Sequence, residues 1–473
     1  MVTLDCKKCS GQLYCSSDDL QLIREHFSMQ NPAYKRGSRF AQSRLYSITP
    51  SGKFEIGLTK DIIIFLDKNY IKYSLTDQLD KEFNCGFDFD NEIETLNISY
   101  RDYQKISIEE SVKQGRGINI IPTAGGKTLI CAGLIKNLRT SMNKPNAIVF
   151  VIVPSIQLVE QTASDFLSYG LTSVTKWSGN NKIDINCNII IAGMQFLLSK
   201  KTDLSILSDV DILLVDECHG LRRGNEINKV LKFVNTPHKF GFTGTLPPAK
   251  IDQWNIIGKI GPIIYEKKTD SLKQENYISN FKITILNIHH KKYIKTSITN
   301  NPIDAYKNEI DFLINSNFRN NIIAKLSLML KNNTLIMVDR ITHGELIENA
   351  IKNLETDKKI FFIRGSTDIE DREEIRSFMM NRDDVVIIAI SKIFSTGINI
   401  PNLHNIIFAS TGKSKIKIMQ SIGRVLRLHH TKTMANIFDI SDNTKYSKLH
   451  LEERKKLYIL EKYENTQKEI KEN

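Results

Sequence analysis

The residues most able to do chemistry lie in the run 118–128, which reads INIIPTAGGKT. Its apolar start is typical of a buried strand, and Gly125 and Gly126 let the backbone turn so that successive amide N–H groups point at one anion. Lys127 adds a cation for the outer phosphates of a nucleotide, and Thr128 supplies a hydroxyl that can bind Mg²⁺. The apolar residues that follow predict a helix whose N-terminus faces the same anion. The run therefore predicts a nucleoside-triphosphate site, whose turn is completed by Pro122, Thr123 and Ala124.

A second group of reactive side chains, Asp216 and Glu217, directly follows the apolar run 212–215. The carboxyl end of a strand is where an open α/β sheet places its ligand, and the two acids have separable tasks there. Asp216 can hold Mg²⁺ together with Thr128, while Glu217 can orient and deprotonate an attacking water. The alternative interpretation is a solvated acidic turn that caps a helix. A carboxylate pair downstream of a phosphate-binding turn favours nucleotide hydrolysis.

The two motifs together resemble those of helicases and translocases of superfamily 2. The turn has the PTxxGKT form of that superfamily, and Ile121 stands where the general GxxxxGK[ST] pattern has its first glycine. The acids are followed by Cys218 and His219, which complete a DExH motif. The resemblance implies ATP and Mg²⁺ as cofactors. It also implies that Lys127, Asp216 and Glu217 are catalytic.

Further segments match the motif series of this superfamily in the expected order. The resemblance implies that the segment before the turn reads adenine, since a glutamine amide offers a donor and an acceptor to a purine edge; its residues are Arg101, Tyr103 and Gln104. Two loops after apolar runs are expected to bind nucleic acid, through Pro154, Ser155, Gln157, Gly193, Met194 and Gln195. A hydroxyl motif is expected to link the state of ATP to domain closure, through Thr243, Gly244 and Thr245 together with His219.

The second half of the chain carries matching motifs. The resemblance implies a nucleic-acid and nucleotide contact at Ser395, Thr396 and Gly397, and a coupling role for Gln420. Arg424 and Arg427 are three residues apart, so they share one face of a helix and can both reach a γ-phosphate as arginine fingers. Taken alone, a Thr-Gly-Thr run is a common turn and an arginine pair is a common solvated face. Their order along the chain favours the motor interpretation.

A closer resemblance is to the UvsW-type helicases of bacteriophages, within the same superfamily. It rests on segments 22–27, 34–40, 239–246 and 339–344, and above all on 393–428. The resemblance implies a motor on branched DNA that regresses forks, migrates four-way junctions and unwinds R-loops, in recombination, repair and replication. An RNA or transcript-release helicase and an ATP-switched annealing factor remain alternatives. A monomer is expected, with replication or recombination proteins as partners.

Composition agrees with a polyanionic partner. The 473 residues carry a formal charge of +12, with a pI near 9.1. No run approaches the roughly 18 apolar residues of a membrane span, and the first residues do not predict a signal peptide. The seven cysteines form no disulfide-like array. We therefore expect a reducing cytoplasm, that of the host if the source is a virus, and no membrane partner.

A zinc site is the alternative interpretation of the cysteines near the start of the chain. Cys6 and Cys9 form a CxxC pair, and Cys15 follows. A structural zinc site needs four ligands, and His26 and Cys85 follow no ribbon or knuckle spacing. We expect no structural zinc.

The pattern of apolar segments predicts an α/β protein with two tandem RecA-like parallel-sheet motor domains after a small α/β domain. Residues 1–92 are expected to form that small nucleic-acid-binding domain, with a helix over 20–27 and strands over 54–56 and 62–65. Residues 93–270 and 271–445 are expected to form the motor domains, the second with strands over 335–338, 360–363, 385–390 and 405–408. Residues 446–473 are expected to form a C-terminal helix that frays from Gln467 onward.

Overall fold

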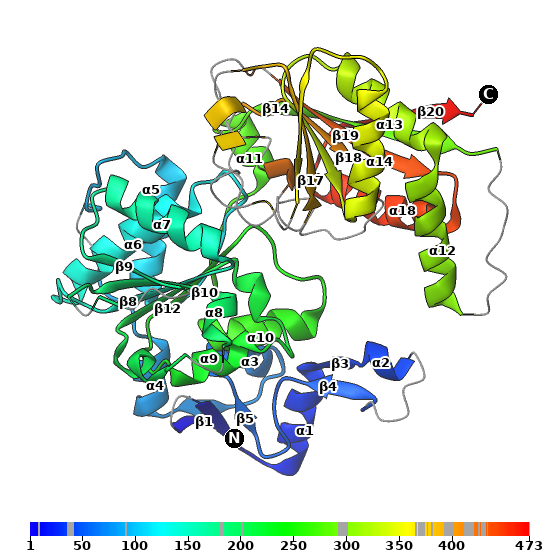
Figure 1. The fold of residues 1–473 in the computed structure, drawn as a ribbon. Coiled ribbons are helices and arrows are strands. Elements are labelled where there is room, and N and C mark those ends of the chain that lie inside the picture. Colours follow the sequence, from blue (N-terminus) through cyan, green and yellow to red (C-terminus); the bar gives the residue numbers. More distant parts are fainter. Residues whose placement is uncertain are drawn as a thin grey trace. The chain divides into compact units, whose positions relative to one another are not determined.

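The protein is described by a computed structural model, drawn in Figure 1. It describes residues 1–7, 10–35, 42–89, 92–178, 183–184, 186–199, 202–291, 301–364, 367, 374–375, 377–379, 382–391, 402–410, 421–423, 426, 432 and 434–472. The chain divides into two compact units. The first comprises Met1–Ile121 and Gly126–Lys267, and the second Pro122–Gly125 and Lys268–Asn473.

The first unit is built on a seven-stranded sheet in the order β13-β7-β12-β11-β8-β10-β9. Its described strands all pair in parallel. Its central strands are buried along almost their whole length and read as continuous apolar runs, as a sheet covered by helices on both faces requires. The strands are β7 (Gly117–Ile120), β8 (Val149–Val153), β9 (Val174–Trp177), β10 (Ile189–Gly193), β11 (Ile212–Asp216), β12 (Lys239–Thr243) and β13 (Ile263–Glu266).

Helices connect these strands, as parallel pairing demands. The longest is α6, which begins at the predicted phosphate lysine and is buried on all sides from Leu129 to Ile135. The helices are α5 (Asp102–Gln114), α6 (Lys127–Ser141), α7 (Ile156–Ser168), α8 (Met194–Leu197), α9 (Ile227–Val230) and α10 (Lys250–Ile260), with 3₁₀ turns η2 (Ser205–Asp209), η3 (Cys218–Leu221) and η4 (Leu231–Phe233).

The N-terminal residues add a small sheet in the order β5-β2-β1-β6 and a two-stranded hairpin β3-β4 to the first unit. The strands are β1 (Val2–Lys7), β2 (Ser10–Tyr14), β3 (Ser28–Gln30), β4 (Arg44–Tyr46), β5 (Lys53–Phe54) and β6 (Tyr73–Leu75), and the helices are α1 (Ser17–His26), α2 (Pro32–Lys35), η1 (Ile56–Leu58), α3 (Thr59–Lys68) and α4 (Asp77–Phe83). The strand predicted over 62–65 is wrong, because these residues lie in α3. Ile62, Phe65 and Leu66 are its buried residues, at the i, i+3, i+4 spacing of a helix face.

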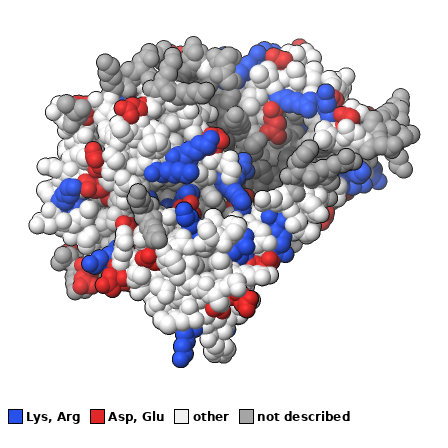
Figure 2. Space-filling view, turned by 90° about the horizontal axis from the view of Figure 1, so that it is seen from below, with Lys and Arg blue, Asp and Glu red and all other residues white. Residues whose placement is uncertain are grey.

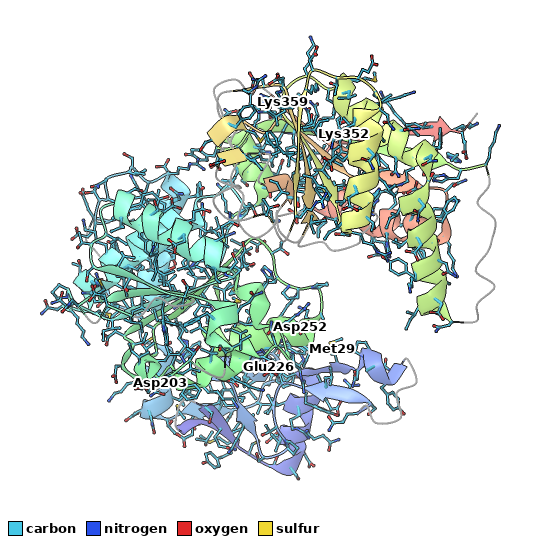
Figure 3. All side chains as sticks on the ribbon, in the orientation of Figure 1. Met29, Asp203, Glu226, Asp252, Lys352 and Lys359 are labelled. Carbon is cyan, nitrogen blue, oxygen red and sulfur yellow. The ribbon has the colours of Figure 1, made fainter. Side chains whose placement is uncertain are left out.

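The N-terminal region packs closely on α10 of the same unit. A Cβ at Gly57 would lie 2.0 Å from the carbonyl oxygen of Ile257, so only a glycine allows this approach. The rings of Phe27 and Trp254 lie 5.4 Å apart. In Figure 3, the labelled Met29 on β3 and Asp252 on α10 lie on facing elements that contact each other. The N-terminal region and the first parallel sheet therefore form one body.

The second unit is built on another seven-stranded parallel sheet, in the order β16-β17-β15-β18-β19-β14-β20. Buried residues of one face of this sheet, among them Ile336, Ile388 and Ile407, form a core with α13 and α14. The strands are β14 (Asn280–His289), β15 (Thr334–Val338), β16 (Lys359–Ile363), β17 (Val385–Ile390), β18 (Asn405–Phe408), β19 (Met434–Asp442) and β20 (Asn465–Lys471). The helices are α11 (Thr269–Gln274), α12 (Pro302–Asn315), α13 (Asn317–Met329), α14 (Ile341–Lys352) and α18 (Lys445–Leu460). Two RecA-like sheets are thus present, as predicted.

The C-terminal segment differs from the prediction of one frayed helix over 446–473. Helix α18 covers its first part, but residues from Asn465 form β20, which pairs in parallel with β14 at the sheet edge. The side chain of Asn287 on β14 donates to Glu469 at 2.8 Å, and Ile470 packs against the core. The sequence gives little sign of this strand, because Ile470 is its one apolar residue.

Candidate nucleotide site

The predicted motifs of the first unit meet at one edge of its sheet. Strands β7, β12, β11, β8 and β10 are successive neighbours, and each ends at a predicted motif. The register places Thr243 of β12 beside Ile120 of β7, and Asp216 of β11 beside Phe242 of β12. Because parallel strands end at the same edge, segments that are far apart in sequence are brought together there. This edge is where open α/β sheets bind ligands.

The phosphate-binding turn has the backbone shape that the glycines predict. The amide of Gly125 donates to the carbonyl of Pro122 at 3.0 Å, and Ala124 has a φ of +69°. Gly126 caps α6 with a φ of +74°. Helix α6 then starts at Lys127, so its first amides are directed towards the turn, where they can bind an anion.

Lys127 and Glu217 form an ion pair. Nζ of Lys127 lies 2.9 Å from Oε1 of Glu217, and the two side chains are 12% and 16% exposed. The other carboxylate oxygen, Oε2, lies 3.1 Å from Nδ1 of His219 and 3.5 Å from Thr243 Oγ1. Nδ1 of His219 also lies 3.0 Å from Thr243 Oγ1. One carboxylate therefore joins the phosphate turn, the DExH motif and the hydroxyl motif.

The hydroxyl motif continues this network along the backbone. Oγ1 of Thr243 donates to the carbonyl of Thr245 at 3.0 Å and accepts from the amide of Thr245 at 3.4 Å. Thr245 and Thr243 are buried, and Gly244 between them is half-buried. The turn after β12 is thus tied to the Thr243 side chain that contacts Glu217.

The two acids differ in electrostatics although they are adjacent. Burial and the charge of Glu217 raise the pKa of Asp216 to about 6. Burial alone would raise the pKa of Glu217 as well, but the Lys127 cation and the hydrogen bond with His219 outweigh it and lower that pKa well below its usual range. Glu217 is therefore an anion near neutral pH, and Asp216 is the acid that a further cation would stabilise most.

The donor set at this edge fits Mg²⁺. Mg²⁺ prefers oxygen ligands and takes one or two carboxylates together with waters and substrate phosphates. Asp216 supplies a carboxylate at the end of β11, and Thr128 supplies a half-buried hydroxyl in the first turn of α6. The raised pKa of Asp216 adds an electrostatic reason for a cation there.

The segment predicted to read adenine lies at the start of α5. Oε1 of Gln104 accepts from the backbone amide of Arg101 at 2.9 Å, and the Gln104 side chain is 2% exposed. A Cβ at Gly126 would lie 2.4 Å from Nε2 of Gln104. Gln104 therefore packs directly against Gly126 of the phosphate-binding turn in this structure. Arg101 donates to the hydroxyl of Tyr103 at 3.2 Å.

The sequence interpretation missed a residue beside this segment. Nζ of Lys267, which follows β13, lies 5.2 Å from the centre of the buried Tyr103 ring. The amide of Lys267 donates to the carbonyl of Ile120 at 2.9 Å. No sequence motif marks Lys267. Its position directly after β13, a strand that neighbours β7, could have indicated that it lies near the nucleotide site.

The two loops predicted to bind nucleic acid are also neighbours. Strands β8 and β10 pair so that Val153 lies beside Gly193. Ser155 then caps α7 by accepting from the Leu158 amide at 3.4 Å, and α8 begins directly after Gly193. Exposed or half-buried side chains at this edge are those of Pro154, Ser155, Gln157, Met194 and Gln195.

The motifs predicted in the second half fall outside the described residues. These are Ser395, Thr396, Gly397, Gln420, Arg424 and Arg427. The strand before the first of them, β17, is described and lies between β16 and β15. The chain positions of these motifs follow strands of the second sheet, and their roles remain predictions.

Comparison with known proteins identifies the class of enzyme. Residues 97–248 match the family model described as the type III restriction enzyme res subunit, and residues 318–429 match the helicase conserved C-terminal domain. The ATP-dependent DNA helicase uvsW of Enterobacteria phage T4 is 29% identical over 92% of this chain and 91% of its own length. The chain is a helicase, and it is similar to the UvsW-type helicases of superfamily 2 along nearly its whole length.

Another relative and a solved structure also resemble this helicase. The DNA 3'-5' translocase XPB2 of Sulfurisphaera tokodaii is 23% identical over 77% of this chain and 87% of its own. The solved structure of the ATP-dependent type ISP restriction-modification enzyme LlaBIII bound to DNA has a TM-score of 0.57, 15% identity, and coverage of 87% of this chain and 34% of that one. That likeness shows the fold. The helicase is an ATP-driven enzyme that acts on nucleic acid. Among its described helices, none is long and apolar enough to cross a bilayer.

Proposed function

We propose that this helicase translocates on DNA and remodels branched structures, namely forks, four-way junctions and R-loops. The observation that carries the proposal is the similarity to the phage T4 DNA helicase along nearly the whole length of both chains. The archaeal relative named a 3'-5' translocase supports tracking in that direction. RNA or transcript release is the competing substrate class.

In this proposal, the chain's own residues prepare the nucleotide for hydrolysis. Lys127 leaves its ion pair with Glu217 for the outer phosphates of ATP, because a phosphate brings more negative charge than one carboxylate. Glu217 is then free to accept a proton from the attacking water, and His219 and Thr243 hold its second oxygen in place. Thr128 and Asp216 would hold Mg²⁺, which neutralises charge on the phosphates.

The second half of the chain contributes the charge that completes the reaction. Arg424 and Arg427 are proposed as arginine fingers that stabilise the transferred phosphoryl group. Gly397 and Gln420 are proposed to contact the nucleotide and to couple its state to movement. Because Thr243 contacts both Glu217 and the Thr245 backbone, the turn after β12 is proposed to respond to loss of the phosphate.

Phosphate contacts are proposed to hold the strand without reading its sequence. They come from Pro154, Ser155, Gln157, Gly193, Met194, Gln195, Ser395 and Thr396, and the 1–92 domain is proposed to bind nucleic acid as well. The chain carries a net charge of +12. On the face drawn in Figure 2, Lys and Arg stand among Asp and Glu with neither sign covering it. Binding is therefore expected to depend on salt.

The test compares ATPase stimulation and strand displacement on forked DNA, four-way junctions, R-loops and single-stranded RNA. We expect branched DNA to stimulate turnover most, and Lys127→Ala and Glu217→Gln to abolish the stimulated ATPase on every substrate. Stimulation by RNA alone would move the helicase to the transcript-release class. Displacement without ATP hydrolysis would instead identify an ATP-switched annealing factor.

A further inference from the structure

A pocket in the second unit is lined by residues to which no role has been assigned above, although Asp339, Arg340 and His343 belong to segment 339–344. It opens where β15 and β18 end, since these strands are neighbours and Met337 of β15 pairs with Phe408 of β18. The chain continues from β15 into Asp339 and Arg340, and from β18 into Ala409 and Ser410, all of which line the pocket. The carboxyl edge of a parallel sheet is the usual ligand position.

The size of the pocket selects the size of its occupant. Its volume is about 120 Å³. A cavity of roughly 150 Å³ in another protein takes up one benzene molecule. The pocket therefore matches the size of one six-membered ring better than that of a fused purine ring system.

The walls favour a flat, uncharged ring. The apolar side chains of Ile310, Leu313 and Ile314 come from α12 and form one side. Tyr306, which is 37% exposed, adds an aromatic ring that Tyr446 holds edge-on at 5.2 Å between ring centres. Flat aromatic rings gain most from such apolar and aromatic surroundings.

The polar groups at the rim disfavour an anion and suit a base edge. A phosphate would meet the carboxylate of Asp339, and Arg340 already pairs with Asp311 at 2.5 Å from Nη1 to Oδ1. Burial and the charge of Asp339 raise the pKa of Tyr306, so its hydroxyl stays protonated. Asp339 can accept from a ring N–H or amino group, while the hydroxyls of Tyr306 and Ser410 can donate to a ring carbonyl.

The floor of the pocket is rigid. Arg319, 1% exposed, donates through Nε to both oxygens of Asp442 at 3.1 Å and through Nη2 to the Ala409 carbonyl at 2.7 Å. Its Nη1 lies 3.3 Å from Nε2 of His343, and because a guanidinium can only donate, this nitrogen must accept. His343 is thus neutral, in agreement with burial and the nearby Arg319 cation, which lower its pKa to about 3.

We propose that this pocket on the second motor unit takes up one unstacked pyrimidine base of the bound strand. The inference rests on the proposed function and adds a subsite to it. Ser395 and Thr396, which are predicted to contact the nucleic acid, follow β17 in the chain. Strand β17 pairs with β15, and the pocket opens at the end of β15. A base held there would stop the strand from sliding while its phosphates remain bound along the sheet edge.

The test measures binding of three single strands of equal length, by fluorescence anisotropy. One carries only thymine, one only adenine, and one has abasic sugars throughout. We expect the wild type to bind the thymine strand about tenfold more tightly than the abasic strand, the range of one stacked base. Ala409→Leu fills the pocket and Tyr306→Ala removes its aromatic wall, and each should abolish most of that ratio. Affinity for the abasic strand should change less than about twofold.

The matched control is Ile303→Ala, on the same helix but away from the pocket and 75% exposed, which should keep the full thymine-to-abasic ratio. If both pocket variants also keep that ratio, the pocket holds no base and the proposal is overturned. The proposal would also be overturned if the protein bound free thymidine but had the same affinity for all three single strands. If the wild type binds none of the three strands, the proposed function itself fails. A thymine preference that vanishes in both pocket variants supports the proposal.

Discussion

At the scale of single residues, the nucleotide site depends on one carboxylate held in a demanding backbone conformation. Glu217 has a φ of +49°, which an L-residue adopts only at a cost. Lys127, His219 and Thr243 hold its side chain from three segments. Such strain persists where the surroundings fix the residue, which is consistent with the catalytic role proposed for Glu217.

Replacing Thr243 by valine tests the link between hydrolysis and movement. The change keeps the shape but removes the hydroxyl that contacts Glu217, His219 and the Thr245 backbone. We expect a loss of about 1–3 kcal/mol in unfolding free energy, because buried polar groups lose a partner. Stimulated ATPase should fall less than strand displacement, so that each ATP unwinds less duplex. A proportional fall of both activities would remove the coupling role.

Gly126→Ala tests the support that Gln104 gives to the phosphate-binding turn. Alanine at a φ of +74° costs about 1–2 kcal/mol, and its Cβ would also displace Nε2 of Gln104. Gly224→Ala is the matched control, with a φ of +80° and no heavy atom within 4 Å of its Cβ. Both variants should lose similar stability in urea unfolding, but only Gly126→Ala should weaken ATP binding. Equal ATP affinity in the two variants would contradict the role of Gln104.

At the scale of elements, the second sheet is fixed to α13 by a buried ion pair. Asp442, the last residue of β19, accepts from Arg319 of α13 and lies 2.9 Å from Nε2 of His290. Burial alone would raise the pKa of Asp442, but Arg319 and His290 outweigh it and lower that pKa. Because the folded pKa is lowered, this pair contributes its full stability at pH values above the unfolded pKa of about 3.9. That contribution is lost as the pH falls through the folded pKa.

Asp442→Asn should therefore destabilise the second unit in a pH-dependent way. Leaving the Arg319 charge buried without its partner costs about 3–5 kcal/mol. The difference in unfolding free energy between wild type and variant should stay constant near neutral pH and shrink below about pH 4. Urea unfolding across that range measures it. Asp384→Asn, which removes a surface pair with Arg382, is the control and should change little. A difference that persists unchanged in acid would show that Asp442 does not titrate as described.

The elements that the sequence predicts well are the ones that are long and apolar. Strand β17 has the predicted bounds, and β18 does as well, because buried parallel strands leave continuous apolar runs. Short elements on the surface of a domain carry less signal. Residues 62–65 fit a strand by composition and lie in α3, and β20 is polar because its pairing with β14 comes from backbone hydrogen bonds. Tertiary contacts determine the secondary structure of such segments.

At the scale of the whole molecule, the sequence predicts two parallel sheets and the edge at which the first one gathers its motifs. Lys127, Asp216 and Thr243 are found there because each motif lies at or just after the carboxyl end of a strand, and parallel strands end at the same edge. The burial of Gln104 and the contact of Lys267 with Tyr103 depend on packing between segments that no motif joins. The pocket between α12 and the ends of β15 and β18 has the same origin. Sequence motifs thus identify reacting groups better than the side chains that support them.

The two halves of the chain are expected to contribute different groups to ATP hydrolysis. The described groups of the first unit can bind phosphate and activate water, but Lys127, which already pairs with Glu217, offers little charge for a developing transition state. If Arg424 supplies that charge, Arg424→Ala should retain ATP binding within about threefold and lose 10³-fold or more in stimulated turnover, on the order known for arginine fingers. Nucleotide titration and steady-state ATPase separate the two effects. Lys127→Ala should instead lose binding and turnover together, because its cation meets the phosphates already in the ground state. Equal loss of binding in both variants would take Arg424 out of the finger role and leave hydrolysis to the first unit alone.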